Sequence, residues 1–315
     1  MATSHSTLDL SGVIPPVITP LTKDGKVDVP AIERLVTYLI ESGVSGLFVL
    51  GSSGEGPWLT SSQRRQVIEE TVRVAAGRVP VLAGVLEPST GRALKAAQMA
   101  EVAGADALVL TSPYYYEAGG ALQIYHVATI ATVTSLPLVL YNIPPATHNP
   151  IAPDTVRELL EIDNLIGIKD SAGNWQDFEK LLELKEARPG FRVLQGAERM
   201  AARAVLAGAD GIVPGLGNLV PGTFDRIFKS ARAGEREAAL ALQEQVNALG
   251  NLQGHGFWLV CLKYAASLLG FGSGAVCGWP AQGKGGDGPN PLPESARSPI
   301  RRLMQKYVME ELQQR

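Results

Sequence analysis

The sequence predicts an α/β protein of the (β/α)8 TIM-barrel class with a C-terminal helical extension. Short, nearly continuous apolar runs alternate with longer stretches of helical periodicity, and parallel strands that are covered on both faces have this apolar character. Through the seventh run, successive runs begin roughly 27 to 33 residues apart, the length of one βα unit. Eight such units in one stretch favour a closed barrel over an open doubly wound sheet.

The expected strands are eight short runs. They are VIPPVITP (13–20), GLFVLG (46–51), VPVLAGV (79–85), ALVLTSP (107–113), LPLVLYN (136–142), LIGIKD (165–170), RVLQGAE (192–198) and GIVPGL (211–216). Two similar segments support a repeated βα unit, because VAGADALVL (102–110) and LAGADGIVP (206–214) both place Gly-Ala-Asp between a helix end and a strand.

The stretches between these runs are expected to be amphipathic helices. From Ile32 to Leu39, apolar residues recur at the spacing of one helical face. Thr60 followed by Gln63 is a capping-box pattern that predicts the start of the next helix. After residue 220 the strand pattern stops and only helical patterns follow. We therefore assign residues 1–225 to the barrel and 226–315 to a helical extension packed on it as one structural unit, with a Gly/Pro-rich loop over 271–299.

Composition and charge exclude several classes of function. The net charge of −3 and the absence of a basic run give no indication of a basic surface that would bind nucleic acid or an anionic membrane. The two cysteines, Cys261 and Cys277, lack a C-x-x-C partner or a histidine cluster, so neither a disulfide framework nor a zinc site is expected. No signal peptide or membrane span is apparent. We expect a cytoplasmic protein.

Candidate functional residues lie where strands end, because active sites of such barrels occupy the C-terminal ends of the strands. Four expected strands end in polar residues that would converge on one cavity. These ends are Gly51-Ser52-Ser53-Gly54-Glu55, Ser112-Pro113-Tyr114-Tyr115-Tyr116, Tyr141-Asn142 and Lys169-Asp170-Ser171.

Lys169 is the most informative of these residues, because an apolar strand runs directly into it. A lysine in a dry pocket has a lowered pKa, since burial disfavours the ammonium. Bringing the pKa from about 10.4 to near 7–8 takes roughly 3 units, or about 4 kcal/mol. The neutral amine can then form a Schiff base with a ketone. The resulting iminium stabilises a carbanion on the adjacent carbon, as making or breaking a C–C bond there requires.

Tyr141 is the natural proton carrier, since it ends the neighbouring strand. Its ordinary pKa near 10 requires a relay partner at neutral pH, and Ser52 or Ser53 is that partner. The GSSGEG turn offers N–H groups and hydroxyls to a small anion, and we expect Glu55 to close this turn structurally. The nucleotide-binding glycine patterns are absent, so we expect no cofactor and no metal.

These motifs occur in the order found in a known family. The chain resembles the class I pyruvate-dependent aldolases typified by dihydrodipicolinate synthase and N-acetylneuraminate lyase, from about residue 10 to 270. The segments that carry the resemblance are GSSGEGPWLT, SPYYY, YNIP, GIKDSAG and GIVPGLGN.

The resemblance implies a role for each matching residue. Lys169 would form the Schiff base with pyruvate, Tyr141 would donate and accept protons, and Ser53 would relay protons to Tyr141. Tyr115 would reach the site of a neighbouring subunit, as in a homodimer or homotetramer. The implied substrate-binding residues are Ser52, Ser53, Val213 (through its backbone carbonyl) and Gly196.

The departures from the family pattern bear on the substrate. Dihydrodipicolinate synthase has an arginine five residues after the motif tyrosine, where this chain has Ala146, and the bidentate carboxylate anchor is lost. Ser61 stands where lysine-inhibited members have histidine, so lysine feedback is not expected.

The leading hypothesis is a lyase that cleaves or forms a 2-oxo-4-hydroxy acid from pyruvate and an aldehyde, such as a 2-keto-3-deoxy sugar acid or 4-hydroxy-2-oxoglutarate. The alternatives are 4-hydroxy-tetrahydrodipicolinate synthase, a dehydratase that uses the same lysine, and a non-catalytic barrel that binds an oxo acid.

Overall fold

The computed structural model describes residues 8–277 and 291–309, and its eight parallel strands form one sheet in the order β1-β8-β7-β6-β5-β4-β3-β2. The strands are β1 (Gly12–Val13), β2 (Leu47–Val49), β3 (Val81–Val85), β4 (Ala107–Thr111), β5 (Leu138–Asn142), β6 (Leu165–Asp170), β7 (Arg192–Gln195) and β8 (Gly211–Ile212). The chain after β1 closes the ring, because Phe48 N donates to Pro15 O at 3.1 Å and Val17 N donates to Phe48 O at 2.8 Å. The predicted barrel is confirmed.

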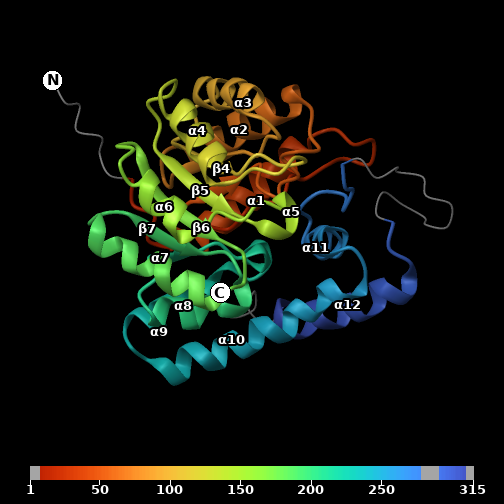
Figure 1. Cartoon of the computed structure of the whole chain (residues 1–315). Helices are drawn as coiled ribbons and strands as arrows, with labels where there is room; N and C mark the ends of the chain where they lie inside the picture. The colour runs from red at the N-terminus through yellow and green to blue at the C-terminus, as the bar shows by residue number, and fades with distance from the viewer. Residues whose placement is uncertain (1–7, 278–290, 310–315) are drawn as a thin grey trace.

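Helices surround the sheet (Figure 1). The α-helices are α1 (Val29–Glu41), α2 (Ser61–Ala75), α3 (Thr90–Val102), α4 (Gly120–Ala131), α5 (Pro144–Thr147), α6 (Pro153–Leu159), α7 (Trp175–Ala187), α8 (Ala201–Leu206), α9 (Pro221–Arg232), α10 (Arg236–Gly250), α11 (Trp258–Ser267) and α12 (Glu294–Tyr307). Three 3-10 turns are η1 (Glu198–Met200), η2 (Gly215–Asn218) and η3 (Asn251–His255). The predicted capping box is present, since Gln63 N donates to Thr60 Oγ1 while Thr60 N donates to Gln63 Oε1. No helix in the described part of the chain is long and apolar enough to cross a membrane.

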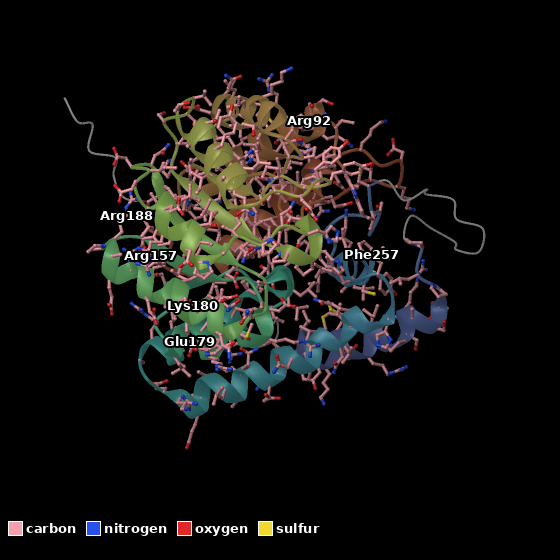
Figure 2. The ribbon with its side chains drawn as sticks, in the orientation of Figure 1. Arg92, Arg157, Glu179, Lys180, Arg188 and Phe257 are labelled. Carbon is pink, nitrogen blue, oxygen red and sulfur yellow. The ribbon has the colours of Figure 1, made fainter. Side chains whose placement is uncertain are left out.

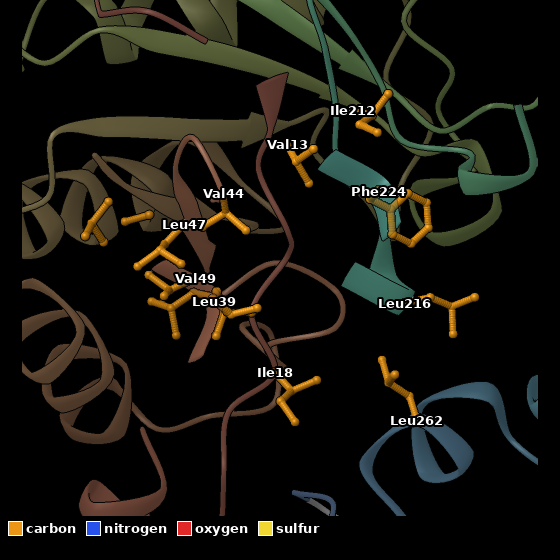
Figure 3. Packing of buried hydrophobic residues seen from close by; sticks show 14 of the residues in the cluster. Val13, Ile18, Leu39, Val44, Leu47, Val49, Ile212, Leu216, Phe224 and Leu262 are labelled. Carbon is orange, nitrogen blue, oxygen red and sulfur yellow. The ribbon is translucent and has the colours of Figure 1, made fainter. Parts of the chain in front are cut away.

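The core has two layers. One fills the barrel interior and includes Leu10, Ile14, Phe48, Leu82, Val109, Val139, Tyr141, Leu194 and Val213. The other lies between strands and helices, and Figure 3 shows part of it, where Val13, Leu47, Val49 and Ile212 share a cluster with Leu39, Phe224 and Leu262. Charged side chains such as Arg157, Glu179 and Lys180 point outward from the helices (Figure 2). Both faces of the sheet are therefore covered by apolar side chains, as is typical of parallel strands.

Several predicted strands are longer than the observed ones. The first forms a regular ladder only at Gly12–Val13 and continues as a single bridge from Pro16 to Phe48, because Pro15 and Pro16 carry no N–H to donate to a ladder. The eighth ends at Ile212, where Pro214 precedes η2. The seventh ends at Gln195, and its predicted last residue, Glu198, begins η1 instead. Only the sixth strand has the predicted bounds.

The C-terminal segment is helical, and α10, α11 and α12 lie together beside the barrel (Figure 1). The helix α9 spans residue 225, at which the sequence analysis divides barrel from extension. The predicted loop over 271–299 is wrong at its end, because α12 begins at Glu294 and contains Pro299. Ala296, Ile300 and Met304 form a buried face at a spacing of four residues, and its packing outweighs the hydrogen bond that the proline removes. Residues 278–290 lie outside the described part of the chain.

Candidate active site

A cavity of about 460 Å³ opens at the C-terminal ends of the strands. Six of the predicted site residues line it, namely Ser52, Ser53, Tyr141, Lys169, Gly196 and Val213. They come from the ends of β2, β5, β6, β7 and β8. The end of β4, which was also expected to contribute, does not line this cavity.

Lys169 occupies the centre of the site. Its side chain is buried, and Nζ lies 3.9 Å from the ring centroid of Tyr141 and 4.9 Å from that of Phe48. The register of β5 on β6 pairs Tyr141 with Lys169, which places both side chains inside the barrel. Burial lowers the pKa of the Lys169 ammonium from its ordinary value of 10.5, while interactions with Tyr141 and Glu198 act in the opposite direction and raise it. The amine is thus shifted toward its neutral, nucleophilic form.

The hydroxyl beside Tyr141 belongs to Ser52. Ser52 Oγ and Tyr141 Oη are 3.3 Å apart and can exchange a hydrogen bond in either direction. The family resemblance implies Ser53 as the relay, whereas the hydroxyl within hydrogen-bond distance of Tyr141 in this structure is that of Ser52. Ser53 is buried and lines the cavity, where its hydroxyl is available to a small anion.

Two glycines make room for the reacting groups. A β-carbon on Gly196 would lie 2.7 Å from Lys169 Cε and 2.1 Å from Ser171 Oγ. A β-carbon on Gly215 would lie 3.8 Å from Ser53 Oγ and 3.5 Å from Glu198 Oε2. Gly196 therefore contributes to the site by the absence of a side chain beside the lysine.

The C-terminal extension holds the GSSGEG turn, which carries Ser52 and Ser53, through buried polar contacts. Glu55 is buried and forms an ion pair with the equally buried Lys263 of α11. Lys263 Nζ also donates to Thr19 O at 2.8 Å, and Thr19 Oγ1 donates to Gly54 O at 2.7 Å. This agrees with the structural role expected for Glu55 and attaches the turn to the extension.

Tyr115 lies outside the cavity of its own chain. It is 83% exposed, in the loop between β4 and α4, with a left-handed φ of 83° and its ring against Tyr116. Its predicted contribution to a neighbouring subunit stays a prediction.

The cavity-lining residues that sequence analysis missed include Glu198, Gln253 and Trp258. Glu198 follows the end of β7, and applying the strand-end rule to that strand as well would have found it. Gln253 and Trp258 come from the extension, for which the sequence carries no such rule. Burial raises the pKa of the Glu198 carboxyl, and hydrogen bonds from Leu216 and Gln253 oppose that rise.

An eight-stranded barrel with a buried lysine at the mouth of a cavity has the architecture of a barrel enzyme, and the sequence motifs identify its class. The chain belongs to the dihydrodipicolinate synthetase family, whose family model matches residues 9–287. Members of this family are lyases, so this protein is an enzyme of that class. The resemblance drawn from the motifs is confirmed.

Two relatives differ in the substrates that their names give. The probable 2-dehydro-3-deoxy-D-pentonate aldolase YjhH of Escherichia coli (strain K12) is 36% identical over 238 residues, which cover 75% of this chain and 79% of YjhH. The 4-hydroxy-tetrahydrodipicolinate synthase of Kosmotoga olearia is 33% identical over 263 residues, which cover 83% of this chain and 89% of the synthase. These two relatives support the same family, but their names give different substrates.

Solved structures of the family match most of the chain. The structure of YagE, a prophage protein from Escherichia coli K12 in complex with pyruvate, has a TM-score of 0.87 and 30% identity, and covers 95% of this chain and 98% of YagE. The dihydrodipicolinate synthase of Acinetobacter baumannii complexed with pyruvate has a TM-score of 0.85 and 31% identity, with coverage of 95% and 98%.

Proposed function

We propose that this enzyme is a Schiff-base lyase that cleaves or forms a 2-oxo-4-hydroxy acid, with pyruvate and an aldehyde as the two parts. One observation carries the proposal: the buried Lys169 amine lies 3.9 Å from the centroid of the Tyr141 ring, and the Tyr141 hydroxyl is hydrogen-bonded to the Ser52 hydroxyl. A buried amine supplies the nucleophile and the hydroxyl pair supplies the proton path. The pyruvate complexes of YagE and of the Acinetobacter baumannii synthase support pyruvate as the oxo acid.

In the proposed reaction, the neutral amine of Lys169 attacks the C2 carbonyl of the 2-oxo acid. Water leaves and an iminium forms. Tyr141 gives its proton to the hydroxyl that leaves as water, and in the cleavage direction its oxygen then takes the proton of the C4 hydroxyl while the C3–C4 bond breaks and its electron pair neutralises the iminium as an enamine. The aldehyde departs, Tyr141 passes that proton to C3, and water releases pyruvate and the free lysine. No cofactor is needed, because the iminium itself accepts the electrons.

The substrate assignment favours an aldolase over 4-hydroxy-tetrahydrodipicolinate synthase. Ala146 stands where the synthase pattern has arginine, and in this structure it is exposed on α5 and does not line the cavity. A bidentate anchor for a second carboxylate is thus missing from that position. The name of YjhH, a 3-deoxy sugar-acid aldolase, points in the same direction.

Borohydride trapping tests the proposal. Pyruvate and borohydride should leave one reduced adduct on Lys169, found by mass spectrometry of the digested protein. Lys169→Ala should abolish the adduct, whereas Lys180→Ala, which removes an exposed lysine on α7, should leave it unchanged. A native enzyme that shows no adduct on Lys169 would contradict the Schiff-base function. Product masses with candidate aldehydes then separate aldol chemistry from loss of water.

A further inference from the structure

Two buried polar residues end the strands that carry the reacting groups. Asn142 follows Tyr141 as the last residue of β5. Asp170 follows Lys169 as the last residue of β6. The register that pairs Tyr141 with Lys169 also pairs these two residues, which we call the strand-end pair. Successive side chains of a strand point to opposite faces, so the strand-end pair faces away from the barrel interior.

A short hydrogen bond joins the strand-end pair. Asn142 Nδ2 donates to Asp170 Oδ1 at 2.7 Å, and Asn142 Oδ1 accepts a hydrogen bond from Ile151 N at 3.0 Å. Burial raises the pKa of the Asp170 carboxyl to about 6, whereas hydrogen bonds from Asn142 and from the Ala172 backbone oppose that rise. At about pH 8 the carboxyl is therefore ionised and only accepts hydrogen bonds.

Backbone hydrogen bonds tie the same positions to the cavity. Ser171 N donates to Asn142 O at 2.8 Å, and Gly196 N donates to Asp170 O at 2.7 Å. Ser171, Gly196 and Ile143 line the cavity. The strand-end pair thus lies in a network that fixes the ends of β5, β6 and β7 relative to one another.

The other contacts of Tyr141 come from a different part of the barrel. Its ring packs edge-on against Phe48 with 5.9 Å between the centroids, and its hydroxyl lies 3.3 Å from Ser52 Oγ. Both partners belong to β2 and the turn after it. The hydrogen bond of the strand-end pair instead connects the strand of the tyrosine to the strand of the reactive lysine.

We propose that the strand-end pair positions Tyr141 for proton transfer to and from the substrate carbon next to the Lys169 iminium. Asn142 and Asp170 do not line the cavity, so they act through the tyrosine and the lysine as positioning residues. This inference rests on the proposed Schiff-base function and adds to it the groups that set its geometry.

Exchange of the C3 hydrogens of pyruvate in D₂O measures this proton transfer without an aldehyde. In the adduct, the C3–H bond breaks, its electron pair neutralises the iminium as an enamine, and the proton passes to the Tyr141 oxygen. That proton exchanges with D₂O, and a deuteron returns from Tyr141 to C3. Borohydride trapping run to completion on the same samples counts the competent sites, so the exchange rate is expressed per trapped site.

Three variants alter the strand-end pair with little change in size. Asn142→Asp sets two carboxylates against each other with no donor between them. Asp170→Asn replaces the charged acceptor of Asn142 and the Ala172 backbone by an amide with one oxygen. The double variant, Asn142→Asp with Asp170→Asn, exchanges donor and acceptor and restores a hydrogen bond between the two positions.

We expect these variants to change kcat for exchange per trapped site. Asn142→Asp should lower it by ~100-fold, the loss that a misplacement of about 1 Å causes. Asp170→Asn should lower it by ~10-fold, as weakening of one hydrogen bond to a charged group does. The double variant should recover most of the loss of Asn142→Asp. In all three, KM for pyruvate should stay within about 2-fold of the native value, because pyruvate binding is not the step affected.

Asp210→Asn is the matched control. Asp210 is a buried carboxylate at the opposite end of the strands, directly before β8, where Oδ2 accepts a hydrogen bond from Val193 N at 2.9 Å. Its loss should lower the urea midpoint and leave the exchange rate per trapped site unchanged. A merely structural role of the strand-end pair would give the same result as this control.

The inference is overturned if both single variants exchange at the native rate per trapped site, or if the double variant exchanges no faster than Asn142→Asp. It is also overturned if Asp210→Asn loses as much as they do. If Asn142→Asp does not fold, the exchange rate of Asp170→Asn against that of Asp210→Asn decides. A native enzyme that forms no adduct with pyruvate contradicts the Schiff-base function itself, whereas native trapping with unchanged variants contradicts this inference alone.

Discussion

Gly196→Ala tests whether the space around Lys169 controls the chemistry. The new β-carbon would lie 2.7 Å from Lys169 Cε and 2.1 Å from Ser171 Oγ, whereas carbon atoms in contact are about 3.5–4.0 Å apart. The lysine side chain must therefore move by roughly 1 Å. A misplacement of that size costs about 100-fold in rate, so we expect the pyruvate adduct to form about 100-fold more slowly.

The fold should survive this change. Gly196 does not have the left-handed φ that disfavours other residues, and overpacking of one methyl costs about 1–3 kcal/mol. The rate of borohydride-trapped adduct and the urea midpoint should be measured on the same samples. Gly91→Ala is the matched control, since no atom lies within 4 Å of its β-carbon position in α3. If Gly196→Ala forms the adduct at the native rate, the steric argument is wrong.

Three further predictions concern polar side chains in the interior and at the cavity. Lys263→Met should lower the free energy of unfolding, measured in urea, by roughly 3–5 kcal/mol, because Glu55 is left buried without its cation. The double variant Lys263→Met with Glu55→Gln should recover part of that loss. A loss below about 1 kcal/mol in Lys263→Met alone would contradict a stabilising role for the ion pair. Ser52→Ala should lower kcat about 100-fold by removing the hydroxyl at 3.3 Å from the tyrosine, whereas Ser53→Ala should mainly raise KM for pyruvate; the reverse pattern would restore Ser53 as the relay. Burial lowers the pKa of His126 from 6.5 to about 4, so the neutral imidazole contributes about 3 kcal/mol to the free energy of unfolding above pH 6.5, and this contribution is lost as the pH falls toward 4. The difference in free energy of unfolding between the native protein and His126→Gln should therefore shrink between pH 6.5 and 4. A difference that stays constant over this range would refute the assignment.

The fold was predictable because parallel strands covered on both faces require uninterrupted apolar residues, and LIGIKD (165–170) meets that requirement over its whole length. The first and eighth strands were overextended because apolar residues continue past the point where prolines end the ladder. The start of α12 was missed for the opposite reason. Its apolar face recurs only every fourth residue, among the prolines of a Gly/Pro-rich segment.

The site was predictable where chemistry follows a strand end and unpredictable where it depends on the direction of a side chain. Lys169 and Tyr141 end paired strands, so their meeting follows from topology. Which of Ser52 and Ser53 faces Tyr141 depends on the backbone path of the turn, which the sequence does not state. Gln253 reaches the cavity from the extension, and such a contact arises only from tertiary packing.

Under the proposed function, the carboxylate of Glu198 has opposite effects on Lys169 before and after the adduct forms. In the free enzyme, burial lowers the pKa of the lysine, and the charge of Glu198 partly reverses that shift. Burial has to exceed this opposition for the amine to attack a carbonyl. In the proposed iminium, the positive charge on the nitrogen is what makes the adduct an electron sink, and a nearby carboxylate stabilises that protonated form. The charge of Glu198, which acts on Lys169 and is anchored by Leu216 and Gln253, would therefore favour the adduct while it lowers the fraction of neutral amine.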